Sequence, residues 1–228
     1  MTVRVVTYNV HGCVGRDGRY DPERVIKVLR HVDGDVIALQ ELQWDPREAL
    51  HLLEDFAHRL HYRPIAGPTL LRKTGHYGNA LLTRLPLKRA VRFDLTFERH
   101  EPRGAIEALL QGPQAPLRVI ATHLGLRPAE RRAQMRRILR HLEHDHCHLT
   151  VLMGDLNEWF LWGRPLRWLR AWFGHMPAPA SFPSSLPVFA LDRIWVRPRE
   201  RLLRLSVHNR GCASVASDHL PVMAELRA

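Results

Sequence analysis

The chain alternates between short apolar runs and polar segments, and most of the apolar runs have the length and composition of buried strands. Residues 3–9 and 35–40 are apolar and β-branched, with turn-forming residues at their ends. Strand-like runs continue at 79–83, 89–95, 104–110, 117–123, 149–153, 190–196, 202–208 and 220–226. The pattern therefore predicts more strands than helices.

Helix signals interrupt this series of strands. Asp21-Pro22 predicts a helix start, because Asp is a good N-cap and Pro suits the first helical position. Asp45-Pro46 repeats the signal before a second apolar series, and residues 128–143 form an arginine-rich segment with one apolar stripe. The mixed order favours an α+β fold or a layered α/β sandwich, with residues 1–228 as a single domain. The Pro-rich segment 176–187 is interpreted as a loop.

A tryptophan-rich segment at 159–174 predicts a short helix between Pro165 and Gly174. Its apolar residues share one arc, and its arginines take the opposite side. Two interpretations stay open for this pattern. The segment is either a helix of the outer layer that packs on a sheet, or an interfacial helix that makes peripheral contact with a membrane.

Composition and charge narrow the classes of protein and partner. A hydrophobic content of 45% excludes a disordered tail protein, and three cysteines exclude a disulfide scaffold. No apolar run approaches the ~20 residues of a transmembrane helix. The first residues also lack the pattern of a signal peptide, so we expect a cytoplasmic protein. A net charge of +11, with arginine as 31 of the 34 basic residues, indicates an anionic partner such as nucleic acid, phospholipid or a phosphorylated small molecule.

Polar side chains stand at the ends of several apolar runs, where a sheet presents residues to a cleft. The candidates are Asn9, His11, Glu41, His123, Asp155, Asn157, Asp192, Asp218 and His219. A single Asp at a strand end is usually a cap or a turn former. Six such places in one chain favour a functional site.

The motifs around these residues resemble the endonuclease/exonuclease/phosphatase superfamily. They are TYNVHG (7–12), LQE (39–41), YGNALLTR (77–84), THL (122–124), GDLNE (154–158), LDRIWV (191–196) and SDHLPV (217–222), in the order seen in that group. The superfamily includes pancreatic-type DNases, abasic-site endonucleases, bacterial sphingomyelinases and inositol-phosphate 5-phosphatases. The resemblance implies a DNase-like four-layer α/β sandwich, in which two packed mixed β-sheets are flanked by helices, and a metal-dependent phosphoesterase.

The resemblance also implies a metal site. Glu41 matches the principal metal ligand of the family, and Asn9 and Asp218 match positions at or near the metal. Mg²⁺ suits such a site, because it prefers hard oxygen ligands and keeps several waters. Mn²⁺ is expected to substitute for it.

Roles in the reaction follow from the same resemblance. Asp155 matches the residue that orients or deprotonates the attacking water, and Asn157 can hold that water or a phosphoryl oxygen. His219 contacts the scissile phosphate, while Asp192 positions its imidazole and favours the cationic form. His123 takes the place of a histidine that can protonate the leaving oxygen in the DNase branch.

Three further residues are assigned to the phosphate or its surroundings. By the same resemblance, Asn79 and Arg103 are expected to support or bind the phosphate, a task that suits a guanidinium. His11 either contacts the metal or is hydrogen-bonded beneath the site, because histidine is rarely chosen for Mg²⁺. The run HLEHDHCH (141–148) lacks the spacing of a zinc site and is interpreted as a histidine-rich helix end.

The sequence therefore predicts a Mg²⁺-dependent phosphodiesterase in which water attacks the phosphorus. The substrate we favour is a phospholipid head group or a small phosphorylated metabolite, because the chain has little room for insertions that grip a duplex. The alternative is an enzyme that cuts DNA or RNA. An inactive anion-binding relative is disfavoured, because the catalytic residue types are all present. The segment 159–174 directly follows GDLNE and should flank the active site.

Overall fold

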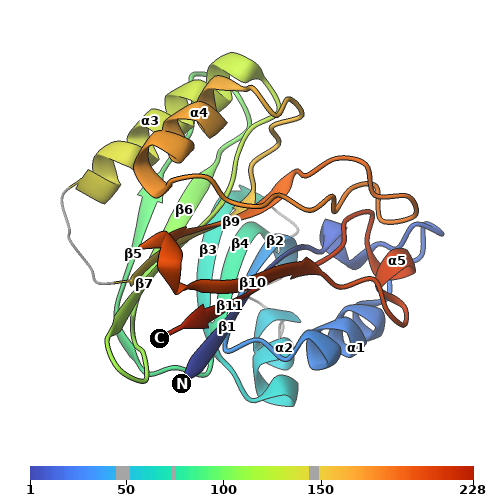
Figure 1. Cartoon of the computed structure of the whole chain (residues 1–228). Coiled ribbons are helices and arrows are strands. Elements are labelled where there is room, and N and C mark those ends of the chain that lie inside the picture. The colour runs from blue at the N-terminus through green and yellow to red at the C-terminus, as the bar shows by residue number, and fades with distance from the viewer. Residues whose placement is uncertain (45–51, 73–74, 144–148) are drawn as a thin grey trace.

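Two mixed β-sheets pack face to face in the computed structural model, which describes residues 1–44, 52–72, 75–143 and 149–228 (Figure 1). The six-stranded sheet has the order β10-β11-β1-β2-β4-β3, and the five-stranded sheet has the order β5-β6-β7-β8-β9. The strands of the first sheet are β1 (Thr2–Asn9), β2 (Val36–Trp44), β3 (Arg63–Arg72), β4 (Gly75–Thr83), β10 (Leu202–Val207) and β11 (Val222–Arg227). Those of the second are β5 (Leu87–Asp94), β6 (Gly104–Gln111), β7 (Pro116–His123), β8 (Leu149–Asp155) and β9 (Asp192–Arg197).

Helices cover the outer face of each sheet, so the four-layer α/β sandwich is confirmed (Figure 1). The helices are α1 (Pro22–Val32), α2 (Leu52–Leu60), α3 (Pro128–Glu143), α4 (Arg164–Phe173) and the short α5 (Ala213–Ala216). One apolar cluster joins α1, α2 and α5 to the six-stranded sheet, and another joins α3 and α4 to the five-stranded sheet. A third cluster fills the space between the sheets. No helix in the described part of the chain has the length and apolar character needed to cross a membrane.

All ten predicted strands are present, and the predicted start of the first helix is confirmed. The side chain of Asp21 accepts a hydrogen bond from the backbone N–H of Arg24, and Pro22 is the first residue of α1. The predicted helix start at Asp45-Pro46 lies outside the described residues, as does most of the histidine-rich run 141–148.

One strand, β3, was not predicted. It contains Pro64, Gly67 and Pro68, which are unfavourable in central strands, and it lies at the edge of its sheet, where proline is tolerated.

A buried arginine fixes the end of α3 on the five-stranded sheet. Arg118 of β7 donates from Nη2 to the carbonyl oxygen of His141 at 3.1 Å, and its Nε donates to Glu107 Oε2 at 2.8 Å. Both side chains of the Arg118–Glu107 ion pair are 2% exposed. Because this cation meets a carboxylate and the free carbonyls of a helix C-terminus, its burial is compensated.

Gly154 allows β7 and β8 to approach each other directly before the candidate residue Asp155. Its φ is +149°, and a Cβ at this position would lie 1.8 Å from the carbonyl oxygen of Thr122. Any side chain there would push the two parallel strands apart.

We therefore expect Gly154→Ala to lower the free energy of unfolding by about 3 kcal/mol, because it adds overpacking to an unfavourable backbone conformation. Gly18 is the matched control, since its φ is +73° but a Cβ there would meet nothing within 4 Å. Gly18→Ala should cost only about 1 kcal/mol. Urea denaturation checks both values, and equal losses would contradict the role of the contact with Thr122.

Candidate active site

The polar strand ends that the sequence singled out come together at one end of the sandwich. β1 and β2 are parallel, with Asn9 opposite Gln40, and β7 and β8 are parallel, with His123 opposite Asp155. Asp155 also lies opposite Asp192 of β9. Because carboxyl ends of parallel strands meet at one edge, each sheet delivers its polar side chains to the same end.

A β-bulge presents Glu41 to this end of the sheet. The register between β2 and β4 shifts between Leu39 and Leu42, and Glu41 has a φ of +57°. Its Oε1 accepts a hydrogen bond from Asn9 Nδ2 at 2.9 Å. Burial alone would raise the pKa of Glu41, but hydrogen bonds from His11 and Asn9 lower it to about 2. Glu41 is therefore ionised at neutral pH.

Asn9 joins the two sheets. Its Nδ2 also donates to Asp155 Oδ2 at 3.1 Å, although Asn9 belongs to the six-stranded sheet and Asp155 to the five-stranded sheet. Its Oδ1 accepts from the backbone N–H of His11 at 3.0 Å. The carboxamide therefore has partners at both ends and holds Glu41 and Asp155 on either side of itself.

His219 is held by Asp192 from the opposite sheet. His219 Nδ1 donates to Asp192 Oδ2 at 2.7 Å, and the same oxygen accepts from Ser181 Oγ at 2.5 Å. Burial alone would lower the pKa of His219, but the charge of Asp192 and the hydrogen bond to it raise the pKa to about 10. The imidazole is therefore a cation at neutral pH, and its Nε2 lies 3.7 Å from Asp155 Oδ2.

Asp155 lies at the centre of the group and is 1% exposed. Its Oδ1 accepts from the backbone N–H of Asn157 at 2.8 Å, which forms an Asx-turn that Asn157 completes with a φ of +49°. Burial, followed by the charge of Asp192, raises the pKa of Asp155 to about 6. At neutral pH the carboxylate is thus mostly ionised and is a stronger base than an ordinary Asp.

His123 contrasts with His219. Burial and the charge of Arg103 lower its pKa to about 3, so the ring is neutral. Arg103 Nη1 lies 2.9 Å from His123 Nδ1, and a second donor, Asn157 Nδ2, lies 3.0 Å from His123 Nε2. His123 Nε2 also lies 3.6 Å from Asp155 Oδ2.

His11 lies between two carboxylates. Its Nδ1 is 3.6 Å from Glu41 Oε2 and 3.6 Å from Asp218 Oδ1. Its pKa is raised, chiefly by the hydrogen bond to Glu41. The predicted metal ligands Glu41, Asn9 and Asp218 therefore surround a place that already attracts a cation.

The donor atoms fit a hard divalent ion. Glu41 and Asp218 supply carboxylate oxygens, the ligands that Mg²⁺ prefers. A second group also brings three potential ligand atoms within 4.8 Å of one another, from Asp155, Asp192 and His219. In that group the ring of His219 and the carboxylate of Asp192 are already hydrogen-bonded to each other, which favours the first group for Mg²⁺.

The two residues predicted to contact the phosphate, Arg103 and Asn79, are hydrogen-bonded to other groups of the protein. Arg103 is 7% exposed and contacts His123 on the side of the ring that faces away from Asp155. Asn79 Nδ2 donates to the carbonyl oxygen of Gly104 at 3.1 Å, which links β4 to β6. Arg103 thus positions His123, and Asn79 helps to join the sheets.

The structure adds residues that the sequence did not single out. Ser181 supports Asp192 from the Pro-rich segment 176–187, which was interpreted only as a loop. Ser217 donates from Oγ to the carbonyl oxygen of Asn9 at 2.7 Å and accepts from the N–H of His219, so it ties the last loop to β1. The motif SDH carried a signal for Ser217, whereas nothing local marked Ser181.

Aromatic side chains form one wall of the site. The Phe182 ring lies 4.7 Å from the His219 ring, and Trp159 contacts both Phe182 and Phe189. The following helix, α4, buries Leu166, Leu169 and Phe173 in the cluster beneath α3, as an outer-layer helix does. The exposed large hydrophobic side chains of 159–174 lie in the loop before α4, at 159–162.

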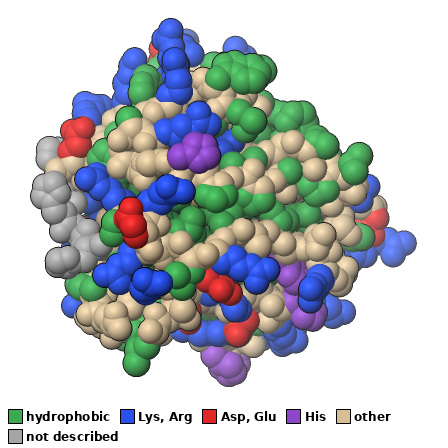
Figure 2. All heavy atoms as spheres, in the orientation of Figure 1, with side chains coloured by type: hydrophobic (Ala, Val, Ile, Leu, Met, Phe, Trp, Pro, Cys, Tyr) green, Lys and Arg blue, Asp and Glu red, His purple; other side chains and the backbone are tan. Residues whose placement is uncertain are grey.

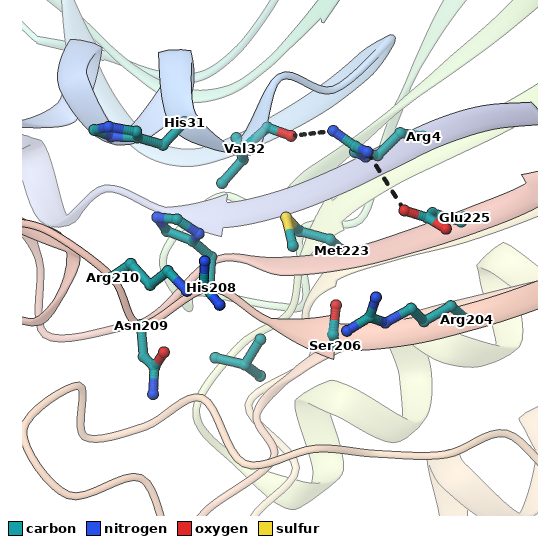
Figure 3. A pocket seen from close by; sticks show the side chains of 11 residues that line it. Arg4, His31, Val32, Arg204, Ser206, His208, Asn209, Arg210, Met223 and Glu225 are labelled. Carbon is teal, nitrogen blue, oxygen red and sulfur yellow. Dashed lines mark hydrogen bonds and ion pairs between the residues drawn. The ribbon is translucent and has the colours of Figure 1, made fainter.

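A separate hollow of about 500 Å³ lies on the outer face of the six-stranded sheet beside α1 (Figure 3). Arg4, Arg204 and Arg210 line it together with a stacked pair of rings, His31 and His208, 6.1 Å apart. The guanidinium of Arg4 donates hydrogen bonds there to the carbonyl oxygen of Val32 and to Glu225 Oε1. None of the candidate catalytic side chains lines this hollow.

Known proteins are similar to this chain in sequence or in fold. The chain is 27% identical over 246 residues to the uncharacterized protein YbhP of Escherichia coli K12. The aligned region covers 98% of this chain and 95% of YbhP. The endonuclease/exonuclease/phosphatase of Beutenbergia cavernae has a similar structure, with a TM-score of 0.79, 22% identity, and coverage of 99% of this chain and 71% of that one. The human Nocturnin catalytic domain, solved with bound sulfate, has a TM-score of 0.75, 17% identity, and coverage of 99% and 93%.

A family model described as Endonuclease/Exonuclease/phosphatase matches residues 6–219. That range contains every motif on which the resemblance was founded, apart from the last residues of SDHLPV. The convergence of these motifs at one end of a four-layer sandwich agrees with the match. The chain belongs to the Endonuclease/Exonuclease/phosphatase family.

Proposed function

We propose that this protein is a Mg²⁺-dependent phosphodiesterase, in which Mn²⁺ substitutes for Mg²⁺. One observation carries the proposal: the buried Asp155 carboxylate lies between a cationic and a neutral histidine and is held by the carboxamide of Asn9. A carboxylate with a raised pKa beside a fixed cation is suited to deprotonate water next to a phosphate.

The side chains divide the reaction between them. Asp155 takes a proton from water as the water oxygen attacks phosphorus, and Asn157 holds the water or a phosphoryl oxygen. The imidazolium of His219 faces the phosphate oxygens that gain negative charge, and Asp192 keeps it protonated and oriented. As the bond from phosphorus to the leaving oxygen breaks, that oxygen keeps the bonding electron pair and takes a proton from solvent, while the neutral ring of His123 hydrogen-bonds to it. The neutral state of His123 favours this role over full proton donation.

Glu41, Asp218 and Asn9 would hold the metal. The bound ion supplies Lewis-acid polarisation of a phosphoryl oxygen. His11 lies between Glu41 and Asp218, so it would contact these carboxylates or the phosphate beside the ion. The favoured substrate is a phospholipid head group or a small phosphorylated metabolite, and the alternative is DNA or RNA.

Metal dependence is the first test. We expect chelation to abolish hydrolysis of the soluble diester bis(4-nitrophenyl) phosphate, and Mg²⁺ or Mn²⁺ to restore it. Glu41→Gln should lower kcat/KM by about 100-fold or more, because it removes the anionic ligand. Glu225→Gln is the matched control, since Glu225 is a half-buried partner of Arg4 and lines the separate hollow beside α1. Full activity of Glu41→Gln with Mg²⁺ would show that the metal assignment is wrong.

The ion pair of Asp192 and His219 provides a second test. Asp192→Asn removes the charge that keeps His219 protonated, so kcat should fall by about 100-fold or more. Ser181→Ala removes the hydroxyl that donates to Asp192 Oδ2 and accepts from its backbone N–H, but it leaves the charge of Asp192, so kcat should stay within about tenfold of the wild type. Steady-state kinetics at neutral pH, with thermal melting to confirm folding, distinguishes these effects. Equal losses in both variants would argue against a specific role for the charge.

The substrate class is tested by a screen of plasmid DNA, RNA, phospholipids and inositol phosphates with Mg²⁺. Asp155→Asn serves as the blank, because it removes the proposed base. We expect the wild type to release product from a phospholipid or a small phosphodiester and to leave the plasmid intact. Plasmid nicking that disappears in Asp155→Asn would establish the nuclease alternative.

A further inference from the structure

Exposed apolar side chains are concentrated in one place, which we call the apolar rim. It consists of Trp159, Phe160, Leu161, Trp162, Leu186, Val188 and Phe189, seven of the twelve large hydrophobic side chains exposed in the described residues. Trp162 and Leu186 are 71% and 72% exposed. In Figure 2, hydrophobic side chains gather on the side of the molecule occupied by α4 and the loop that leads to β9. A group of this kind marks an interaction surface, unlike single exposed apolar residues.

The backbone of the apolar rim is fixed by hydrogen bonds. The N–H of Gly163 donates to the carbonyl oxygen of Phe160 at 2.9 Å, and Arg170 Nη2 donates to that of Leu161 at 2.8 Å. In the second segment, the N–H groups of Val188 and Phe189 both donate to the carbonyl oxygen of Phe182. These side chains are thus held outward by an ordered backbone.

The apolar rim is continuous with the active site. The Trp159 ring lies 4.9 Å from Phe189 and 5.6 Å from Phe182, and the Phe182 ring lies 4.7 Å from His219. Trp159 therefore joins the two segments of the rim to each other and to the wall of the catalytic centre. A surface that covers the rim will lie directly beside the proposed phosphate site.

Cations border the apolar rim. Phe160 and Trp162 line a cavity of about 250 Å³ together with Arg132, Arg164 and Arg167. Arg164 and Arg167 are exposed, and within the described part of the chain their guanidinium groups make no hydrogen bond or ion pair. Aromatic and aliphatic side chains beside free arginines match the chemistry of a membrane interface with anionic head groups.

We propose that the apolar rim inserts into the surface of an anionic phospholipid bilayer and that the phosphodiester cleaved at the site is that of a phospholipid head group. This inference rests on the proposed phosphodiesterase function and names its substrate class. A nucleic acid strand could stack on the aromatic residues, but Leu161, Leu186 and Val188 offer no aromatic face for a base. The aliphatic side chains gain from hydrocarbon, so the whole rim fits a bilayer better than a strand.

Flotation of the full chain with vesicles tests the inference. One set of vesicles contains phosphatidylcholine alone, and the other contains phosphatidylcholine and phosphatidylglycerol in equal parts. We expect binding to the anionic vesicles, and a loss of about tenfold or more in Trp162→Ser/Leu186→Ser. Leu203→Ser, which changes an exposed leucine on β10, is the matched control and should bind like the wild type. Arg164→Gln/Arg167→Gln should reduce the preference for phosphatidylglycerol.

Activity distinguishes failure of this inference from failure of the proposed function. Trp162→Ser/Leu186→Ser should still hydrolyse bis(4-nitrophenyl) phosphate, while its activity on vesicle phospholipid falls together with binding. The inference is overturned if the wild type does not float with the anionic vesicles, or if the double variant floats equally well. It is also overturned if single-stranded DNA binds the wild type and loses affinity for the same double variant. A wild type that floats but does not cleave the soluble diester would instead contradict the phosphodiesterase proposal.

Discussion

The candidate active site of this molecule depends on polar contacts between two sheets that are otherwise joined by apolar packing. Asn9 reaches across to Asp155, and Asp192 reaches back to His219 from the other sheet. Both contacts need the sheets at one fixed separation, which the apolar cluster between them sets. A shift of either sheet would therefore alter the spacing of the carboxylates and the charge of the histidine together.

Neighbouring groups give the two histidines of the site, His123 and His219, different charge states at neutral pH. His123 and His219 are both buried, but Arg103 faces the first and Asp192 faces the second. The pKa of His123 falls to about 3, and that of His219 rises to about 10. One imidazole is thus neutral and the other a fixed cation, a separation that suits a site where a proton moves and negative charge develops.

Local patterns predicted the strands and the candidate residues at their ends, because the burial pattern and the length of a strand are determined by a few consecutive residues. They did not predict β3, whose prolines are acceptable only at an edge that the sequence does not reveal. They also missed Ser181, because its contact with Asp192 depends on how a long loop folds back. The contact between Arg103 and His123 Nδ1 could not be predicted either, because a sequence motif identifies a residue but not the atom that it contacts.

The prolines of β3 have a consequence for the behaviour of the chain in concentrated solution. An edge strand with a full row of free N–H groups is a template for strands of other molecules, and so for aggregation. Pro64 and Pro68 carry no N–H, and the register of β3 against β4 shifts after Pro68. This margin of the six-stranded sheet is therefore a poor acceptor for a foreign strand, which matters for a protein that also exposes several large apolar side chains.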